Sequence, residues 1–327
     1  MTVSRATLKR ELPISDLKAE RGRSVRVERL LFDLKTLRKI GGAFSRNRLG
    51  IIGAVLLISF VSMALLAQPL HSFDLIQDPN DVMASSDSTE IFKAPSGSHL
   101  LGTDDKGRDI LSQLFYGTQN SLIVGFAAAA LTMIFGSVIG LVAGAYGRAV
   151  DEFLMRFTDL FLVIPWLPFA VILASFLPPL NQPSMYKIII VIGLTSWPPA
   201  ARIVRSQVLS IRERTFIERS IALGAGKLHI MRRHLLPNVF PLVFANAILS
   251  VSNAILSESF LAFFGIGDPT RITWGMMLYN GYNFGGFASR AYWFIVPPGL
   301  CIILVVLGFT FVSYALDEVL NPRLRKR

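Results

Sequence analysis

The sequence predicts an all-α membrane protein with six transmembrane helices. The chain has 327 residues, of which 52% are hydrophobic and 17% are charged, and its mean hydropathy is +0.51. Soluble globular chains carry about 25% charged residues, so this composition argues against an ordinary soluble enzyme. The apolar residues also gather in long blocks, most of them near the roughly 20 residues that a helix needs to cross a bilayer core.

Six apolar blocks account for the predicted transmembrane helices. They are residues 49–67, 121–146, 160–180, 188–201, 235–267 and 291–316. The fourth block has 14 residues and is closed by Pro198 and Pro199, so it is also compatible with a re-entrant segment. The fifth block contains a single charged residue, Glu258, and Asp159 lies at the edge of the third. These two carboxylates are the candidate intramembrane polar residues.

The distribution of basic residues predicts the orientation of the helices. Lys and Arg number 33 against 22 Asp and Glu, which gives a net charge of +11. Thirteen of the basic residues lie in 1–48, eight in 202–236 and four after residue 316. Six crossings place these three segments on one side, and the positive-inside rule makes that side cytoplasmic. We therefore expect a multi-pass protein of the plasma or inner membrane with both termini in the cytoplasm.

The same pattern divides the chain into five parts. Residues 1–48 form a basic cytoplasmic tail, 49–67 the first transmembrane helix, 68–118 an extracytoplasmic loop, 119–316 the transmembrane core, and 317–327 a cytoplasmic C-terminal tail. Within the first tail, apolar residues recur at helical spacing and predict an amphipathic helix on anionic lipid, although a solvated positive anchor explains them equally well. They are Leu30, Leu31, Leu34, Leu37 and Ile40. Because the other basic residues border apolar blocks, we expect membrane lipid and not nucleic acid as their partner.

The segment 202–236 reads as a folded helix–turn–helix between the fourth and fifth spans. Val204, Val208 and Ile211 continue a helix beyond the fourth span, and Ile217 with Ile221 occupies a second helical face. A pair of glycines, at positions 224 and 226, then ends that helix. Two interpretations remain open: a docking surface for a cytosolic protein, or a packing element at the membrane surface without a partner.

Three stretches of the sequence resemble one transporter family. The 218–237 segment is similar to the Glu-Ala-Ala…Gly…Ile-x-Leu-Pro loop of ABC importer permeases, with Glu218, Gly224, Leu236 and Pro237 in register and Arg219 and Ser220 in place of the two alanines. The stretch 101–109 is similar to the Leu-Gly-Thr-Asp-x-x-Gly-Arg-Asp signature of the dipeptide and oligopeptide branch. Residues 258–278 resemble the fifth span and following loop of that branch. The resemblance covers about residues 40–320.

This resemblance implies the type I ABC importer permease fold, with a cytoplasmic coupling helix between spans 4 and 5. It also implies a heterodimer with a homologous second permease, two cytosolic ATPase subunits that bind ATP and Mg, and an extracytoplasmic substrate-binding protein. The cargo would be dipeptides or oligopeptides, with short oligosaccharides, nickel or glutathione as alternatives. The residues expected in the coupling loop are Ile217, Glu218, Ile221, Ala222, Gly224, Ala225, Leu236 and Pro237.

Two features of the coupling loop follow from its residue types. Gly224 is expected to need a positive φ or a close approach to a partner surface. Ile217 and Ile221 are expected to project into a cleft of the ATPase, because they give an exposed loop an apolar face. The alternative is that this face packs on the protein's own helix ends.

No catalytic or metal-binding motif points to an enzyme. A phosphate-binding loop needs Gly-x-x-x-x-Gly-Lys-Ser/Thr, but Ile221 replaces its first glycine and Leu228 its Ser/Thr. We therefore expect a non-catalytic subunit without a cofactor of its own. The four histidines have no ligand spacing, and the carboxylates at positions 104, 105 and 109 lack that of a calcium loop, so we expect no metal and interpret these carboxylates as a turn with a helix cap.

A secondary transporter is the main alternative of another class, and a purely structural membrane subunit is a further one. Ion coupling would require intramembrane ionisable groups, and Glu258 and Asp159 alone are few for a proton or sodium relay. An ionised Glu258 among Phe260, Phe263 and Phe264 would be costly, so this carboxyl is expected to be protonated, paired or facing a wet cavity. Two roles remain open for it: a hydrogen bond in helix packing, or a place in the translocation path.

Overall fold

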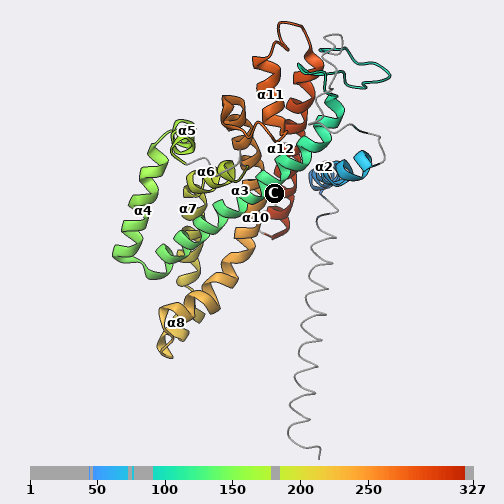
Figure 1. The fold of residues 1–327 in the computed structure, drawn as a ribbon. Coiled ribbons are helices and arrows are strands. Elements are labelled where there is room, and N and C mark those ends of the chain that lie inside the picture. Colours follow the sequence, from blue (N-terminus) through green and yellow to red (C-terminus); the bar gives the residue numbers. More distant parts are fainter. Residues whose placement is uncertain (1–43, 45–46, 73–75, 77–90, 178–184, 321–327) are drawn as a thin grey trace, which may run out of the picture.

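The computed structural model describes residue 44, residues 47–72, residue 76, residues 91–177 and residues 185–320, and within these ranges the regular structure is helical (Figure 1). The helices, in chain order, are α2 (Arg48–Ser72), α3 (Ile110–Tyr146), α4 (Arg148–Val163), α5 (Trp166–Phe176), α6 (Met185–Thr195), α7 (Pro198–Arg212), α8 (Thr215–Ala222), α9 (Lys227–Ile230), η2 (Met231–Leu235), α10 (Leu236–Leu261), η3 (Ala262–Ile266), α11 (Trp274–Asn283) and α12 (Tyr292–Leu320). The predicted all-α class is therefore confirmed.

Four helical segments of the described residues are each long and apolar enough to cross a membrane. They are Arg48–Ser72, Ile110–Tyr146, Lys227–Ile266 and Tyr292–Glu318. Two further helix pairs are long and apolar enough to cross a membrane only when each pair is counted as one span. They are α4 with α5, bent by 96°, and α6 with α7, bent by 45°. Counting each bent pair as one broken span gives the six predicted spans, and without the pairs the described residues contain four.

Proline explains both breaks. The third span was expected as one helix over 160–180, but Ile164 is extended ahead of Pro165, a position where the proline ring disfavours helical backbone. The fourth span was expected to end at its two prolines. α6 does end just before them, at Thr195, and Pro198 and Pro199 begin α7, where their missing N–H groups would have no helical partner in any case. The expectation of a single helix over 160–180 was therefore wrong, whereas α7 is the helix expected beyond the fourth span.

The second span begins earlier than predicted, at Ile110 instead of residue 121. Asp109 is the N-cap of α3, and its carboxylate accepts a hydrogen bond from the Ser112 N–H at 2.8 Å. Asp104 accepts from the backbone N–H groups of Lys106 and Arg108, so the turn and cap expected from this aspartate cluster are confirmed. The predicted loop 68–118 is consequently shorter at both ends, since α2 also continues to Ser72.

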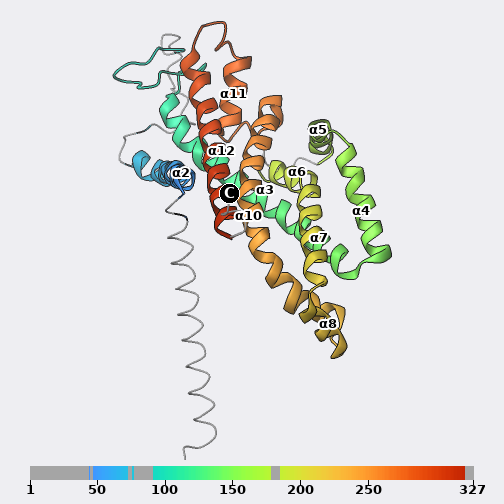
Figure 2. The same cartoon turned by 180° about the vertical axis from the view of Figure 1, so that it is seen from behind.

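The described part of the molecule has two opposite ends, which we call the α8 end and the α11 end after the helices that lie there (Figure 1). α3 runs diagonally through the molecule, with α2 and α12 side by side on one flank and α4 on the other, as the reverse view also shows (Figure 2). The basic tail 1–48, with its expected amphipathic helix, lies almost entirely outside the described residues. Residues 317–320 of the expected C-terminal tail still belong to α12.

Glycines bring α3 and α7 into close contact. Gly136, Gly140 and Gly144 recur every fourth residue, on one face of α3. A Cβ at Gly136 would lie 2.6 Å from the Ala200 Cβ, and one at Gly140 would overlap the Ala201 carbonyl oxygen. Small residues at this spacing let membrane helices approach closely enough for extensive van der Waals contact. The close pairing of α3 with α7 therefore depends on these three glycines, which have no side chains to keep the helices apart.

Replacing Gly140 by Leu should destabilise the protein by about 3 kcal/mol, because the new side chain must displace the backbone of α7. The midpoint of thermal unfolding in detergent, followed by circular dichroism, should fall by at least about 5 °C. Gly299→Leu in α12 is the matched control, since nothing in the described chain lies within 4 Å of a Cβ there. Equal midpoints for the two variants would contradict the packing described for α3 and α7.

Candidate functional site

The segment 202–236 is the ordered helix–turn–helix that the sequence predicts, and it forms the α8 end (Figure 1). α7 ends at Arg212, α8 follows after a short turn, and the chain then reverses into α9. Gly224 makes the reversal with a φ of +83°, so the expected positive φ is confirmed. Its N–H donates to the Ile221 carbonyl at 2.9 Å, and the Ala225 N–H donates to that of Ser220 at 3.0 Å. A Cβ at position 224 would meet nothing within 4 Å, so the requirement for glycine within this chain is conformational.

The expectation that Ile217 projects outward is wrong. Its side chain is fully buried, and it packs in an apolar cluster with residues of α7, α9, η2 and α10. These residues are Val204, Val208, Ile211, Ile230, Leu235 and Val239. The turn before α8 folds this helix back on the end of α7, which turns the Ile217 face inward. The alternative interpretation, packing on the protein's own helix ends, therefore holds for this residue.

The exposed apolar residues of the α8 end are instead Ile221 at 54%, Leu223 at 89% and Leu228 at 49% exposure, which we call the apolar tip. Leu223 was not among the residues predicted from the sequence, although an apolar residue directly before a turn glycine was a usable signal. Of the other expected residues, Glu218 and Ala222 of α8 are exposed beside the tip, Ala225 is half-buried, and Leu236 and Pro237 are exposed at the start of α10.

Basic side chains surround the apolar tip. Arg219, Lys227, Arg232 and Arg233 are all exposed, and Lys227 lies over the Tyr146 ring with its Nζ 5.3 Å from the centroid. An apolar patch that is rimmed by charged residues is typical of a protein–protein contact surface. The α8 end is thus suited to a partner that offers an apolar recess with acidic groups around it.

Three arginines of α7 attach this helix to α3 and α4. Arg205 forms a two-pronged ion pair with Asp151, in which its Nη2 lies 2.6 Å from Oδ2. Arg202 pairs with Asp159 at 2.5 Å, so this candidate intramembrane carboxylate serves as an ion-pair partner of α7. Arg212 donates to the Gly144 carbonyl near the end of α3 at 3.2 Å. Together with the glycine contacts, these bonds join α3, α4 and α7 into one unit that ends in α8.

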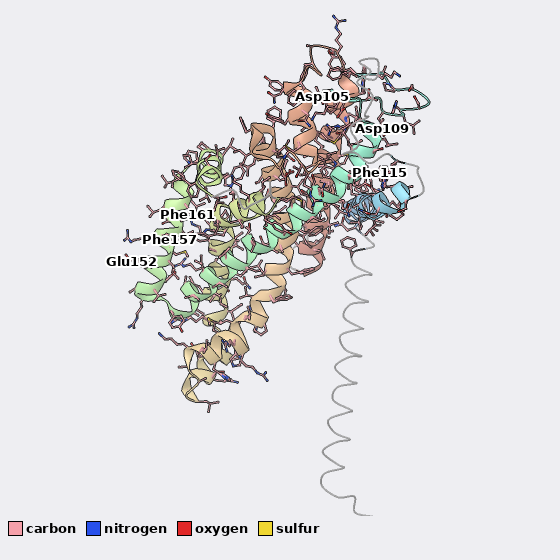
Figure 3. All side chains as sticks on the ribbon, in the orientation of Figure 1. Asp105, Asp109, Phe115, Glu152, Phe157 and Phe161 are labelled. Atoms are coloured by element: carbon pink, nitrogen blue, oxygen red, sulfur yellow. The ribbon has the colours of Figure 1, made fainter. Side chains whose placement is uncertain are left out.

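Charged and aromatic residues of the described chain lie at the opposite end and on the outer flank. Figure 3 places Asp105 and Asp109 at the α11 end and Glu152, Phe157 and Phe161 along α4. Burial and the neighbouring Asp104 carboxylate raise the pKa of Asp105 above its ordinary value. This end is tied to α12 by a hydrogen bond from the Trp293 indole N–H to the Thr103 carbonyl at 3.3 Å. It therefore forms a compact structural cap on the bundle.

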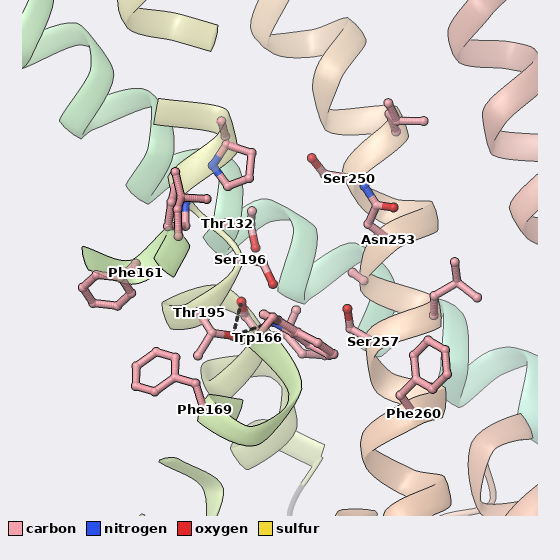
Figure 4. Close-up of a pocket in the computed structure, with 18 of the residues that line it drawn as sticks. Thr132, Phe161, Trp166, Phe169, Thr195, Ser196, Ser250, Asn253, Ser257 and Phe260 are labelled. Atoms are coloured by element: carbon pink, nitrogen blue, oxygen red, sulfur yellow. Dashed lines mark hydrogen bonds between the residues drawn. The ribbon is translucent and has the colours of Figure 1, made fainter. Parts of the chain in front are cut away.

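A cavity of about 700 Å³ lies between this unit and α10. Its walls come from α3, the two broken spans and α10, and they include both proline breaks at Pro165 and at Pro198 and Pro199. Aromatic rings face it from Phe161, Trp166, Phe169 and Phe260, and the Trp166 indole N–H donates to the Thr195 hydroxyl at 3.1 Å (Figure 4). None of the described residues that line the cavity is charged.

Polar groups line the cavity from two sides. Thr132, Thr195 and Ser196 lie opposite a row on α10 that consists of Asn246, Ser250, Asn253 and Ser257 (Figure 4). None of these residues was predicted from the sequence. The signal was four amide and hydroxyl side chains that share one face of a helix, which a search for charged residues does not detect.

Glu258 lies on α10 but does not line this cavity. Its side chain is fully buried, with the Ser259 hydroxyl 3.5 Å from Oε2, while Oε1 has no hydrogen-bond partner among the described residues. Glu258 is thus buried near the end of α10, away from the cavity, and its expected role in helix packing stays a prediction.

Comparison with known proteins identifies the family. Residues 136–326 match the family model described as "Binding-protein-dependent transport system inner membrane component". The chain belongs to this family. It is therefore a multi-pass membrane component, a permease, of a binding-protein-dependent transport system, as the resemblance in its sequence predicted.

Curated relatives cover most of the permease. It is 34% identical over 281 residues to the dipeptide transport system permease protein DppC of Alkalihalophilus pseudofirmus, covering 86% of this chain and 88% of the relative. It is 31% identical over 285 residues to the oligopeptide transport system permease protein OppC of Bacillus subtilis, again covering 86% and 88%. A solved structure of the MetNI methionine ABC transporter matches 64% of this chain and 95% of its own, with 22% identity and a TM-score of 0.46.

Reversing one charge of the Asp151–Arg205 pair should lower the stability of the permease by about 1–3 kcal/mol, between the values of exposed and buried pairs. Asp151→Arg should reduce the unfolding midpoint, and the double variant Asp151→Arg with Arg205→Asp should restore most of it. Glu152→Gln is the control, because the Glu152–Arg156 pair is exposed and should not change the midpoint measurably. Additive losses in the double variant would show that α4 and α7 are not joined by this pair.

Proposed function

We propose that this permease is one of two membrane subunits of an ATP-driven importer, and that it carries dipeptides or oligopeptides delivered by an extracytoplasmic binding protein. The observation that carries the proposal is a continuous connection in this family member: the apolar tip of α8 is joined through α7 to the wall of an uncharged cavity. The printed names of the DppC and OppC relatives support peptides as the cargo.

Energy would enter at the α8 end from two cytosolic ATPase subunits that bind ATP and Mg. The apolar tip would seat in a cleft of one ATPase, with Glu218, Ala222, Gly224, Ala225, Leu236 and Pro237 around it and Ile217 supporting α8 from inside. When ATP closes the ATPases, α8 would move and α7 would carry that movement to the cavity wall at Pro198–Ile203. This chain would contribute no catalytic group and no cofactor.

A homologous second permease would complete the path. The cavity is open within the single chain, and α10 exposes Phe240, Phe244 and Phe260 on its surface. Aromatic residues of this kind are enriched in subunit interfaces. Closing this side with the partner subunit would leave a passage that alternates between the two sides of the membrane.

The neutral cavity argues against a secondary transporter. Ion coupling needs ionisable groups along the path. Here Glu258 is buried away from the cavity, and Asp159 is paired with Arg202. The same absence of charge among the described lining residues favours an organic cargo over nickel.

Reconstitution of the permease pair with its ATPase and binding protein tests the proposal. Uptake of a radiolabelled dipeptide should require ATP, the ATPase and the binding protein, and an uptake driven by an ion gradient alone would contradict it. Gly224→Val should lower ATP-dependent uptake at least about tenfold, because a β-branched residue at a φ of +83° strains the turn that shapes the apolar tip.

Gly226→Val is the matched control for this prediction. It lies in the same turn and is equally open, but its φ of −71° and ψ of 158° suit a β-branched residue. It should retain most of the uptake and of the substrate-stimulated ATP hydrolysis. Equal activity of the two variants would show that the conformation of Gly224 is irrelevant to coupling.

The orientation follows from the basic α8 end, which we place in the cytoplasm together with both termini. In a Cys301→Ala background, Phe284→Cys at the α11 end should react with an impermeant thiol reagent added to intact cells. Lys227→Cys at the α8 end should react only after the membrane has been permeabilised. Labelling of position 227 in intact cells would overturn this orientation.

A further inference from the structure

The polar row on α10 occupies a single face of the helix. Asn246, Ser250, Asn253 and Ser257 follow one another at intervals of four, three and four residues, which keeps them within one stripe. Figure 4 shows Ser250, Asn253 and Ser257 on the wall formed by α10, across the cavity from Thr132, Thr195 and Ser196. The stripe is therefore a continuous polar surface along one face of α10.

The hydrogen bonds of the stripe divide it into two parts. The Asn246 amide donates to the Leu242 carbonyl at 3.0 Å, and the Ser250 hydroxyl donates to the Asn246 carbonyl at 2.9 Å. Neither the Asn253 amide nor the Ser257 hydroxyl hydrogen-bonds to another residue of the described chain. An amide at membrane depth that lacks a partner costs several kcal/mol, so these two groups need water or cargo in the cavity. They are the residues of the stripe whose side-chain donors and acceptors are all available to a ligand.

The hydrogen-bonding groups of Asn253 and Ser257 are complementary to the backbone of a peptide. An asparagine amide offers two N–H donors and a carbonyl acceptor, and a serine hydroxyl both donates and accepts. A peptide group presents the complementary donor and acceptor whatever its side chains are. The terminal charges and charged side chains of a peptide find no counter-ion among the described lining residues. Aromatic rings at Phe161, Trp166 and Phe169 give apolar side chains a surface to pack on.

We propose, building on the peptide-import function above, that Asn253 and Ser257 form a contact surface for the backbone amide groups of a peptide in transit. The absence of charge among the described residues around them makes passage through this subunit indifferent to the charge of the cargo. Selection by charge is thereby left to the binding protein, and the cavity accepts whatever peptide that protein releases.

The first experiment introduces a charge without changing the size of the side chain. In the reconstituted complex, wild type and Asn253→Asp are compared for the uptake of lysyl-alanine and glutamyl-alanine, each presented at saturating concentrations of the loaded binding protein. The ratio of lysyl-alanine to glutamyl-alanine uptake should rise about tenfold in the variant, because a carboxylate acts strongly in a cavity of low dielectric constant. Asn283→Asp, an exposed asparagine on α11, makes the same chemical change outside the cavity and should leave the ratio unchanged.

The second experiment removes the hydrogen-bonding groups. Asn253→Leu keeps a similar volume and should lower the uptake of both dipeptides about tenfold, while the purified complex retains its second permease and its basal ATP hydrolysis. An unchanged uptake ratio in Asn253→Asp, together with unchanged uptake in Asn253→Leu, would overturn the inference. Loss of the second permease from the purified Asn253→Leu complex would also overturn it, since Asn253 would then be a subunit contact.

The two proposals fail in different ways. If wild type takes up neither dipeptide when ATP, the ATPase and the binding protein are present, the peptide-import function itself is wrong. If wild type takes up both and the variants behave like wild type, only the role of the α10 stripe is wrong.

Discussion

The close contact between α3 and α7 is the constraint on which the rest of the structure depends. Three glycines of α3 leave room for the backbone of α7, and three arginines of α7 secure it to the end of α3 and to α4. Because α7 reaches from the cavity to α8, this contact joins the cavity wall to the apolar tip. In the proposed importer, a displacement at α8 would reach the cavity wall without passing through a flexible linker.

The two broken spans obey the same physical rule as the continuous ones. Backbone groups at membrane depth need hydrogen-bond partners, so irregular backbone is tolerated only where it is buried in protein or lines a cavity. The breaks at Pro165 and at Pro198 both border the cavity. The prolines that divide these helices therefore also shape the space that we assign to the cargo.

Charged residues and the uncharged lining of the cavity occupy different parts of the described molecule. Basic residues surround the apolar tip at the α8 end, ion pairs join α4 to α7, and the described cavity wall carries only amides, hydroxyls and apolar groups. Ion pairs thus hold α4 and α7 together. In the proposed importer, the described lining residues would present no charge that holds a passing ligand too tightly to release it.

The sequence by itself determined the helical class, the apolar blocks, the helix cap at Asp109 and the positive φ of Gly224, because composition, periodicity and turn chemistry are local properties. Family-specific motifs added the transporter class. Only the tertiary structure decided that Ile217 is buried while Leu223 is exposed, that Asp159 is paired with Arg202, and that Asn253 faces a cavity that Glu258 does not reach. Periodicity shows which residues share a face of a helix, but the neighbour that covers that face comes from segments far away in the chain.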